Sequence, residues 1–192
     1  MSKLETKDLI NVGIFSAIYV IVVFLIGMLG YIPILMVTYP IYLPLIAGIP
    51  FMLFITKVEK FGMISLMALT CGLIMFLTGH TWLPILTAII FGVLSDLIIK
   101  KGKYKSFKYI AIGYGVFANW FLGPFLPFWL MRDIYIQHIQ ENMGTEYANS
   151  LLSLTPNWLP FVIIIVFFIS GVVGAYLGRS VLKKHFQRAG IL

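Results

Sequence analysis

The sequence predicts an all-α integral membrane protein, a polytopic bundle of six transmembrane helices forming a single domain over residues 1–192. Sixty per cent of the residues are hydrophobic and 11% are charged, whereas soluble domains carry about 25% charged residues. Lipid offers the backbone no hydrogen-bond partners, so spans must be helices or a closed barrel. The apolar stretches are long and do not alternate with polar residues, which favours helices over barrel strands.

The first two predicted helices, residues 9–29 and 34–55, differ in regularity. The first carries no charge, and at about 1.5 Å rise per residue it crosses a hydrocarbon core of about 30 Å. A cleavable signal peptide is the alternative, but the apolar region of such signals is only about 7–15 residues long. The second contains Pro40, Pro44 and Pro50. Because proline lacks a backbone donor and kinks helices, we expect this helix to be bent or partly unwound.

Four further helices complete the predicted bundle. A charged turn precedes residues 61–77, and a T-G-H-T loop separates that helix from residues 82–99. A lysine-rich connection leads to residues 109–130, and the last helix covers residues 158–182. Between these two lies the one long polar loop, residues 131–155, in which we expect a short surface helix.

The basic residues predict the orientation in the membrane. Of the 14 Lys and Arg residues, all but Arg132 fall in the N-terminal tail, the turn at 57–60, the connection at 100–108 and the C-terminal end. The positive-inside rule therefore places both termini in the cytoplasm of a bacterial cell membrane. The net charge of +7 then reflects topology, which argues against nucleic-acid binding. We expect the lysines at 100–108 to contact anionic membrane lipid.

The stretch from Asn119 to Asp133, N-W-F-L-G-P-F-L-P-F-W-L-M-R-D, crowds polar and aromatic side chains at one end of an apolar segment. It ends in Arg132, the one basic residue predicted outside. We therefore expect a cavity opening outward, in which a small planar molecule stacks on tryptophan and meets polar groups at its edge. The predicted ligand-binding residues are Tyr39, His80, Trp82, Asn119, Trp129, Arg132, Asp133, Asn157 and Trp158.

Each of these residues also has a structural interpretation. The tryptophans lie where interfacial aromatic belts occur, and a belt needs no ligand. Arg132 and Asp133 can pair in water, an interaction worth less than about 1 kcal/mol. His80 can be a solvated loop residue, and Asn119, deep in its predicted helix, can join two helices through its amide.

Sequence motifs of catalysis and of energy coupling are missing. The chain has no G-x-x-x-x-G-K-[ST] phosphate loop, no H-E-x-x-H and no G-x-S-x-G. Cys71, the single cysteine, offers no disulfide and no metal-ligand spacing. The one carboxylate inside a predicted span is Asp96, near its cytoplasmic end. We therefore predict a non-enzymatic protein without cofactor or metal, and one unable to drive active transport alone.

Small residues four positions apart allow helices to approach closely. The last predicted helix has two such pairs, Gly171 with Ala175 and Gly174 with Gly178, for which we favour packing inside the bundle. The first helix has one pair, Gly13 and Ala17, on an otherwise bulky surface. That pair serves either internal packing or contact with another subunit.

Blocks along nearly the whole chain resemble one family. They include K-L-E-T-K-D-L-I-N-V-G-I-F-S-A-I-Y at the start, then G-M-L-G-Y-I-P, G-I-P-F-M-L-F, T-G-H-T-W, L-P-F-W-L-M-R-D, L-T-P-N-W and L-G-R-S-V-L-K-K-H-F. In these the chain is similar to the Trep-Strep (MptD) family of bacterial integral membrane proteins. That family is regarded as a group of S components, the substrate-binding subunits of energy-coupling factor (ECF) transporters, which are ATP-driven importers.

The resemblance implies partners as well as a fold. S components are six-helix proteins that bind a vitamin or other micronutrient from outside and work with a transmembrane T subunit and two cytoplasmic ATPases. Their first helix carries an Ala-x-x-x-Ala motif that meets the T subunit. Gly13 and Ala17 would be the matching pair here, with glycine in place of the first alanine.

Two other functions stay open on the sequence. One is a self-contained membrane facilitator or a membrane scaffold whose aromatic residues form only an interfacial belt. The other is a membrane enzyme, which lacks support because no catalytic constellation is recognisable. A facilitator would not copurify with ATPases, whereas an S component would.

Overall fold

The computed structural model describes residues 3–188, without the side chains of His185 and Phe186, and its regular structure there is entirely helical. The elements in order are α1 (Thr6–Gly27), the 3-10 helix η1 (Met28–Tyr31), α2 (Pro33–Val37), α3 (Tyr39–Ile55), α4 (Met63–Leu77), α5 (Leu83–Lys101), α6 (Phe107–Ala118), the 3-10 helix η2 (Asn119–Phe121), α7 (Leu122–Phe125), α8 (Pro127–Leu130), α9 (Arg132–Met143), α10 (Thr145–Leu154), α11 (Leu159–Val181) and α12 (Lys183–Arg188).

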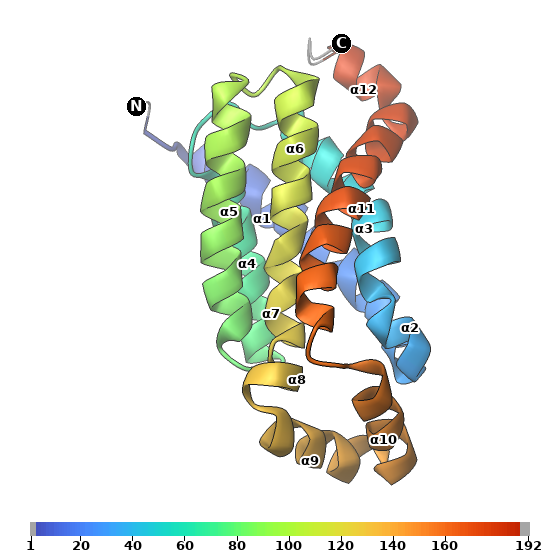
Figure 1. The fold of residues 1–192 in the computed structure, drawn as a ribbon. Coiled ribbons are helices and arrows are strands. Elements are labelled where there is room, and N and C mark those ends of the chain that lie inside the picture. The colour runs from blue at the N-terminus through green and yellow to red at the C-terminus, as the bar shows by residue number, and fades with distance from the viewer. Residues whose placement is uncertain (1–2, 189–192) are drawn as a thin grey trace.

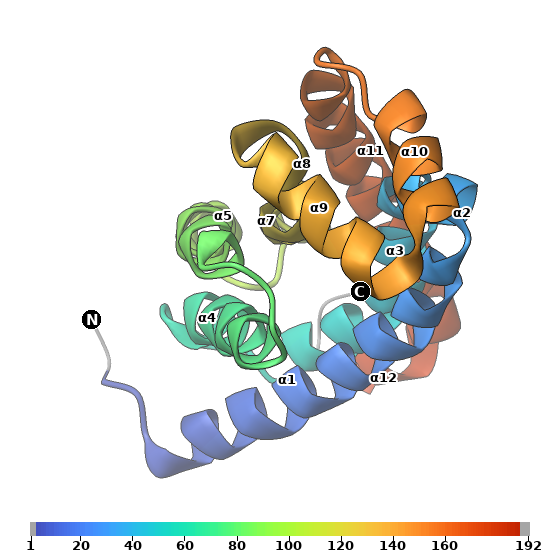
Figure 2. The same cartoon turned by 90° about the horizontal axis from the view of Figure 1, so that it is seen from below.

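The long helices pack in a closed ring. Contacts run from α1 to α4, α5, α6, α11, α3 and back to α1. In Figure 1 the helices α5, α6 and α11 stand side by side, and α9 and α10 lie across the lower end of the bundle. Seen from below in Figure 2, α4 and α5 appear nearly end-on while α1 runs across the view. The helix α1 is thus strongly tilted against its neighbours.

Within residues 3–188, three helices are long and apolar enough to cross a membrane: α1 with η1 (Thr6–Tyr31), α5 and α11. The helices α3 and α4 are apolar but shorter. Large apolar side chains on the outside of the bundle are bare, for example Leu25 and Phe161, as expected for surfaces that contact lipid rather than water. The helical class is therefore confirmed, and these three apolar helices are clear candidates for membrane spans, whereas six spans stay a prediction.

The bend expected within residues 34–55 is present. The helix α2 ends at Val37, and the non-helical residue Thr38 separates it from α3, which begins at Tyr39. The Thr38 hydroxyl donates to the Ile34 carbonyl at 2.8 Å and lies 3.3 Å from the Leu35 carbonyl oxygen, so it binds the last turn of α2. Pro40 follows in the first turn of α3, where its missing N–H costs least.

The structure differs from the sequence prediction over 109–130, for which we expected one continuous helix. There the chain forms α6, η2, α7 and α8 in succession. Pro124 and Pro127 lack the N–H that a continuous helix needs, so the segment breaks into short turns. The following polar segment also holds more than the single surface helix expected, since α9 and α10 meet at Gly144, whose φ is 90°.

The small residues of α11 pack inside the bundle, as the sequence analysis favoured. A Cβ on Gly178 would lie 2.9 Å from the Gly48 carbonyl oxygen of α3, and one on Gly171 would lie 2.8 Å from the Gly115 Cα of α6. These backbones touch because no side chain separates them. Around Gly13 of α1, by contrast, an added Cβ would meet no atom within 4 Å.

The buried carboxylate of Asp96 has a structural role at the end of the bundle that carries the lysine-rich connection. Its Oδ2 accepts from the Gly62 N–H at 2.8 Å and the Ser65 N–H at 3.1 Å, and its Oδ1 accepts from the Tyr104 hydroxyl at 3.0 Å. The first two donors belong to the first turn of α4. Asp96 of α5 therefore caps α4, and its negative charge is favourable beside that helix N-terminus.

Candidate functional site

A pocket lies at the end of the bundle away from the lysine-rich connection, with lining residues from α1, α4, α7 and the α9–α10 pair. Figure 1 shows α9 and α10 at that end. The cavity has a volume of about 460 Å³, within the range of about 300–1,000 Å³ of small-molecule sites. Its lining comes from nine helices, two of them 3-10, and one loop of the described residues. The lining residues are Val23, Phe24, Gly27, Met28, Gly30, Tyr31, Met36, Tyr39, Met75, His80, Phe121, Pro124, Phe125, Tyr135, Met143 and Tyr147.

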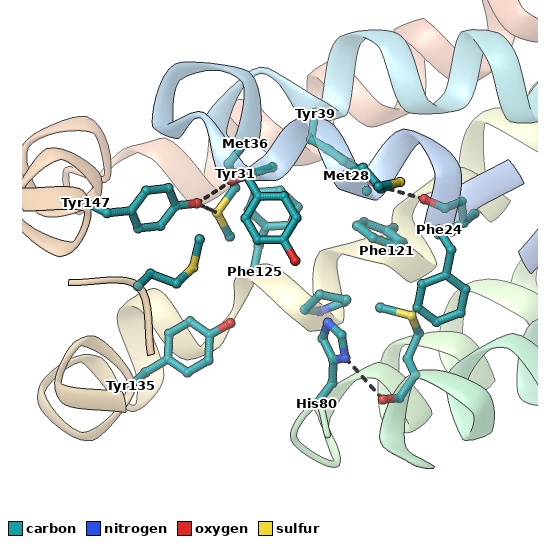
Figure 3. Close-up of a pocket in the computed structure, with 16 residues that line it drawn as sticks. Phe24, Met28, Tyr31, Met36, Tyr39, His80, Phe121, Phe125, Tyr135 and Tyr147 are labelled. Atoms are coloured by element: carbon teal, nitrogen blue, oxygen red, sulfur yellow. Dashed lines mark hydrogen bonds between the residues drawn. The ribbon is translucent and has the colours of Figure 1, made fainter. Parts of the chain in front are cut away.

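One wall of this pocket is aromatic (Figure 3). The rings of Tyr39 and Phe121 are stacked, with centroids 5.2 Å apart and planes inclined by 16°. Phe125 meets Phe121 edge-on at 6.2 Å. Because the faces and edges of aromatic rings favour other rings in stacked or T-shaped arrangements, this wall suits a planar ligand.

Four methionines complete the apolar lining: Met28, Met36, Met75 and Met143. The thioether side chain has several rotatable bonds and a polarisable sulfur, so it adapts to irregular shapes and favours contact with aromatic rings. A pocket lined in this way can adjust its shape to a bound molecule.

The polar groups of the pocket are four tyrosines and one histidine. The Tyr39 hydroxyl donates to the Val23 carbonyl at 3.0 Å, and the Tyr147 hydroxyl donates to the Gly30 carbonyl. His80 Nδ1 lies 3.2 Å from the Met75 carbonyl oxygen. Burial lowers the pKa of His80, against a smaller opposite effect of that carbonyl, so its ring is neutral at neutral pH.

The α9–α10 pair closes this end of the bundle and is fastened at both ends of α10. Near its start, Tyr147 binds the backbone of η1 through Gly30. At its end, the Arg132 guanidinium donates to the Thr155 carbonyl at 3.0 Å and to the Leu152 carbonyl at 3.3 Å. The last carbonyls of a helix lack partners within it, and a cation there is favourable.

The structure brings two of the nine predicted ligand residues, Tyr39 and His80, together in the pocket lining. Trp129 lies outside the lining, and its indole N–H donates to the Pro156 carbonyl at 3.0 Å. Arg132 is likewise bound to backbone carbonyls. Asp133 is exposed and forms no ion pair with Arg132.

The remaining four predicted residues also lie outside the pocket lining. Trp82 and Trp158 are 56% and 61% exposed, as side chains of an interfacial belt would be. Asn157 is exposed. Asn119 is buried; its amide N–H donates to the Gly115 carbonyl at 3.1 Å, and its Oδ1 accepts no hydrogen bond from residues 3–188 as described. Contact of these residues with a ligand stays a prediction.

Sequence reasoning missed most of the lining. The stretch from Asn119 to Asp133 does contribute to the pocket, but through Phe121, Pro124 and Phe125. The other large contribution comes from the end of α1 and from η1, where the sequence G-M-L-G-Y interrupts the apolar helix. Two glycines beside methionine and tyrosine at a helix end were the available signal.

Taken together, the ring of apolar helices, the bare apolar exterior and the pocket at one end define a helical integral membrane protein. Residues 6–188 match the family model described as "Hypothetical bacterial integral membrane protein (Trep_Strep)". The chain belongs to this Trep_Strep family, which confirms the resemblance seen in its sequence. No curated protein and no solved structure matches the chain.

Proposed function

We propose that this protein is the S component of an ECF-type importer, which captures a small vitamin-like or micronutrient molecule from outside. The observation that carries the proposal is the uncharged aromatic pocket of about 460 Å³. It lies at the end of the bundle opposite the lysine-rich connection, and the positive-inside rule assigns that connection to the cytoplasm. The proposal includes six spans, both termini in the cytoplasm, and delivery inward by a T subunit with two ATPases.

The exposed face of α1 supports a docking role. Gly13 and Ala17 are exposed, and they are surrounded by bare apolar side chains such as Ile10, Ile14 and Ile21. The chain's own packing does not use this small-residue pair, whereas it uses the glycines of α11. An apolar helix face with small residues four positions apart lets a second transmembrane helix approach closely.

A layer of bulky side chains beneath the pocket favours this proposal over a self-contained facilitator. One helical turn below the lining residue Val23 lies Tyr19, which is 1% exposed, and next to Phe121 lies Trp120, which is fully buried. The Trp120 indole N–H donates to the Tyr19 hydroxyl at 3.4 Å. A facilitator needs a path through this layer, whereas an S component needs only the pocket and a partner.

The function is tested by copurification from the native membrane with the chain tagged at one end. The proposed S component retains a transmembrane T subunit and two ATPases, whereas a facilitator or scaffold retains none of them. The proposal would be contradicted by a chain that purifies without these subunits in mild detergent and that, reconstituted alone, transports small molecules into vesicles.

The docking face is tested by Ala17→Leu. The added bulk should prevent close approach of a partner helix, so the retained ATPases should fall at least about tenfold while the chain's own melting temperature is unchanged. Val173→Leu is the control, because Val173 is exposed on α11, away from the small-residue pair. Equal recovery of the ATPases with both variants would exclude α1 as the docking face.

A further inference from the structure

Among the residues that the structure describes, the pocket lining contains no Asp, Glu, Lys or Arg. An ionised carboxylate, phosphate or ammonium group of a ligand would therefore leave water without meeting an opposite charge. Burial of an unpaired charge costs several kcal/mol, whereas burial of an uncharged polar group costs little once it is hydrogen-bonded. The lining thus discriminates against charged ligands. It does so because it offers no opposite charge to pair with them, and not because it repels them.

The shape of the lining favours a flat ring. Tyr39 and Phe121 form a stacked pair at 5.2 Å, and Phe125 and Met75 lie on the same lining. Ring faces and thioethers both give their best contacts to aromatic groups. An aliphatic ligand of the same volume would gain burial but none of these oriented contacts.

Hydrogen bonds already present in the protein decide which polar groups are available. The hydroxyls of Tyr39 and Tyr147 donate to backbone carbonyls. Within the part of the chain that the structure describes, the hydroxyls of Tyr31 and Tyr135 donate to no protein acceptor, and in Figure 3 both carry no dashed line. These two hydroxyls can therefore donate to a ligand or accept from it.

His80 supplies an acceptor of defined position. A carbonyl oxygen only accepts hydrogen bonds, so the Nδ1 atom at 3.2 Å from the Met75 carbonyl must carry the proton. Burial favours the neutral ring by lowering the pKa of His80, which leaves Nε2 with a free lone pair. In Figure 3 the second ring nitrogen of His80 faces away from that carbonyl, toward the side of the pocket where Phe121 and Phe125 lie.

We infer that the pocket takes an uncharged, planar aromatic molecule bearing an N–H or O–H donor, and that His80 Nε2 accepts the hydrogen bond from that donor. This inference rests on the proposed substrate-binding function and names the class of its ligand. The aromatic wall holds the ring, and the Tyr31 and Tyr135 hydroxyls meet the remaining polar atoms.

The test uses three probes that share the indole ring system and differ in net charge. They are indole-3-acetamide, which is neutral, indole-3-acetate, which is an anion, and tryptamine, which is a cation. Each is titrated by ligand-observed NMR onto the full chain in lipid nanodiscs at pH 7.5. The neutral amide should bind at least about tenfold more tightly than the anion and the cation. Equal or tighter binding of either charged probe, or no binding of any of the three, would overturn the inference.

The acceptor is tested with a fourth probe, methyl 1-methylindole-3-acetate, which is neutral and has no donor. His80→Phe should weaken the binding of indole-3-acetamide about tenfold and leave the affinity for the donor-free probe unchanged, because only indole-3-acetamide donates a hydrogen bond to Nε2. His80→Gln, which places an amide oxygen near Nε2, should restore part of the loss. His138→Phe is the matched control, since His138 is exposed on α9.

Unchanged binding of the donor-free probe to His80→Phe also shows that the variant retains the pocket, so a folding defect is not mistaken for a lost hydrogen bond. Equal losses for both probes would overturn the role of Nε2. A preference for charged probes would overturn the ligand class while copurification with the ATPases still upholds the function. Failed copurification would overturn the function and leave the probe results intact.

Discussion

Arg132 shows how one cation can hold the end of a helix pair. Its guanidinium donates to the carbonyls of Phe128, Leu152 and Thr155, and so ties α8 to the end of α10. Its departure from the charge bias of the chain suggested a ligand contact. The structure gives a second physical reason for a positive charge at this place, namely the partnerless carbonyls at a helix C-terminus.

Replacing Arg132 with alanine should therefore destabilise the α9–α10 pair. Hydrogen bonds to a charged donor contribute about 1.5–3 kcal/mol, so Arg132→Ala should lower the free energy of unfolding by about 2 kcal/mol. Thermal unfolding in detergent, followed by circular dichroism, measures this. Asp133→Ala is the control because Asp133 is exposed, and a surface change of this kind stays within about 0.5 kcal/mol. Equal melting temperatures of the two variants would refute the capping role.

His80 makes ligand binding depend on pH in a defined direction. Its pKa lies below the ordinary 6.5 because of burial, so Nε2 stays unprotonated through neutral pH and loses its lone pair only when the pH falls below that lowered pKa. The other titratable groups of the lining are Tyr31, Tyr39, Tyr135 and Tyr147, and burial raises the pKa of Tyr135 to about 12.

Affinity for indole-3-acetamide should thus be constant from about pH 8 to about pH 6.5 and then fall as the solution becomes more acidic. The free energy of unfolding should also fall as the solution becomes more acidic, because the unfolded chain binds a proton on His80 at a higher pH than the folded chain does. Titration of the probe at several pH values measures the effect, with His80→Gln as the control that should give a flat profile. An affinity that rises on acidification would contradict the assigned tautomer.

At the scale of elements, glycines of the long helices lie in two kinds of place: some lie where two helix backbones touch, and one lies on the outer surface of the bundle. The backbones of α11, α3 and α6 touch at glycines, whereas α1 presents Gly13 to the outside. Sequence spacing alone does not separate these cases, because both patterns have small residues four positions apart. Burial decides, and burial depends on which helices become neighbours.

Gly171→Ala and Gly13→Ala should therefore have opposite effects on stability. The new Cβ at position 171 would meet the Gly115 Cα at 2.8 Å, so the α6 and α11 backbones must separate, at a cost of about 1–3 kcal/mol. At position 13 the new Cβ meets nothing, and the gain in helix propensity is at most about 1 kcal/mol. Melting temperatures of the two variants check this. Similar shifts for both would show that the close approach contributes nothing.

The helices themselves were largely predictable from the sequence. Apolar length placed α1, α4, α5 and α11 to within a few residues. The prolines indicated an irregular helix over 34–55, and the chain does break at Thr38, just before Pro40, while α3 continues through Pro44 and Pro50. The short turns over 109–130 were not predicted, although Pro124 and Pro127 lie there, because hydropathy is continuous across them. Length and hydropathy report on the lipid environment, whereas such breaks depend on local backbone hydrogen bonds.

At the scale of the whole molecule, the pocket results from the meeting of segments far apart in the chain. Gly30 and Tyr147 join through one hydrogen bond, although more than a hundred residues separate them. The sequence indicated the end of the bundle at which this pocket lies and two of its lining residues, Tyr39 and His80. Which face of each helix lines the pocket is decided by tertiary packing. Tryptophans at the membrane interface and aromatic residues of the pocket therefore look alike in sequence.

The division of the molecule into two ends underlies the proposed function. One end carries the lysines and the buried Asp96 cap, and the other carries the uncharged pocket closed by α9 and α10. Tyr19 and Trp120 fill the bundle between them. This arrangement suits a subunit that holds a ligand on one side and depends on other proteins to release it on the other.

Native mass spectrometry of the tagged chain, purified gently from its own membrane, is the decisive experiment for the proposed function. We expect one assembly that contains this chain, a transmembrane T subunit and two ATPases, together with a small uncharged aromatic molecule that dissociates at raised collision energy. A chain that appears alone, or bound only to copies of itself and to lipid, would contradict the proposed function.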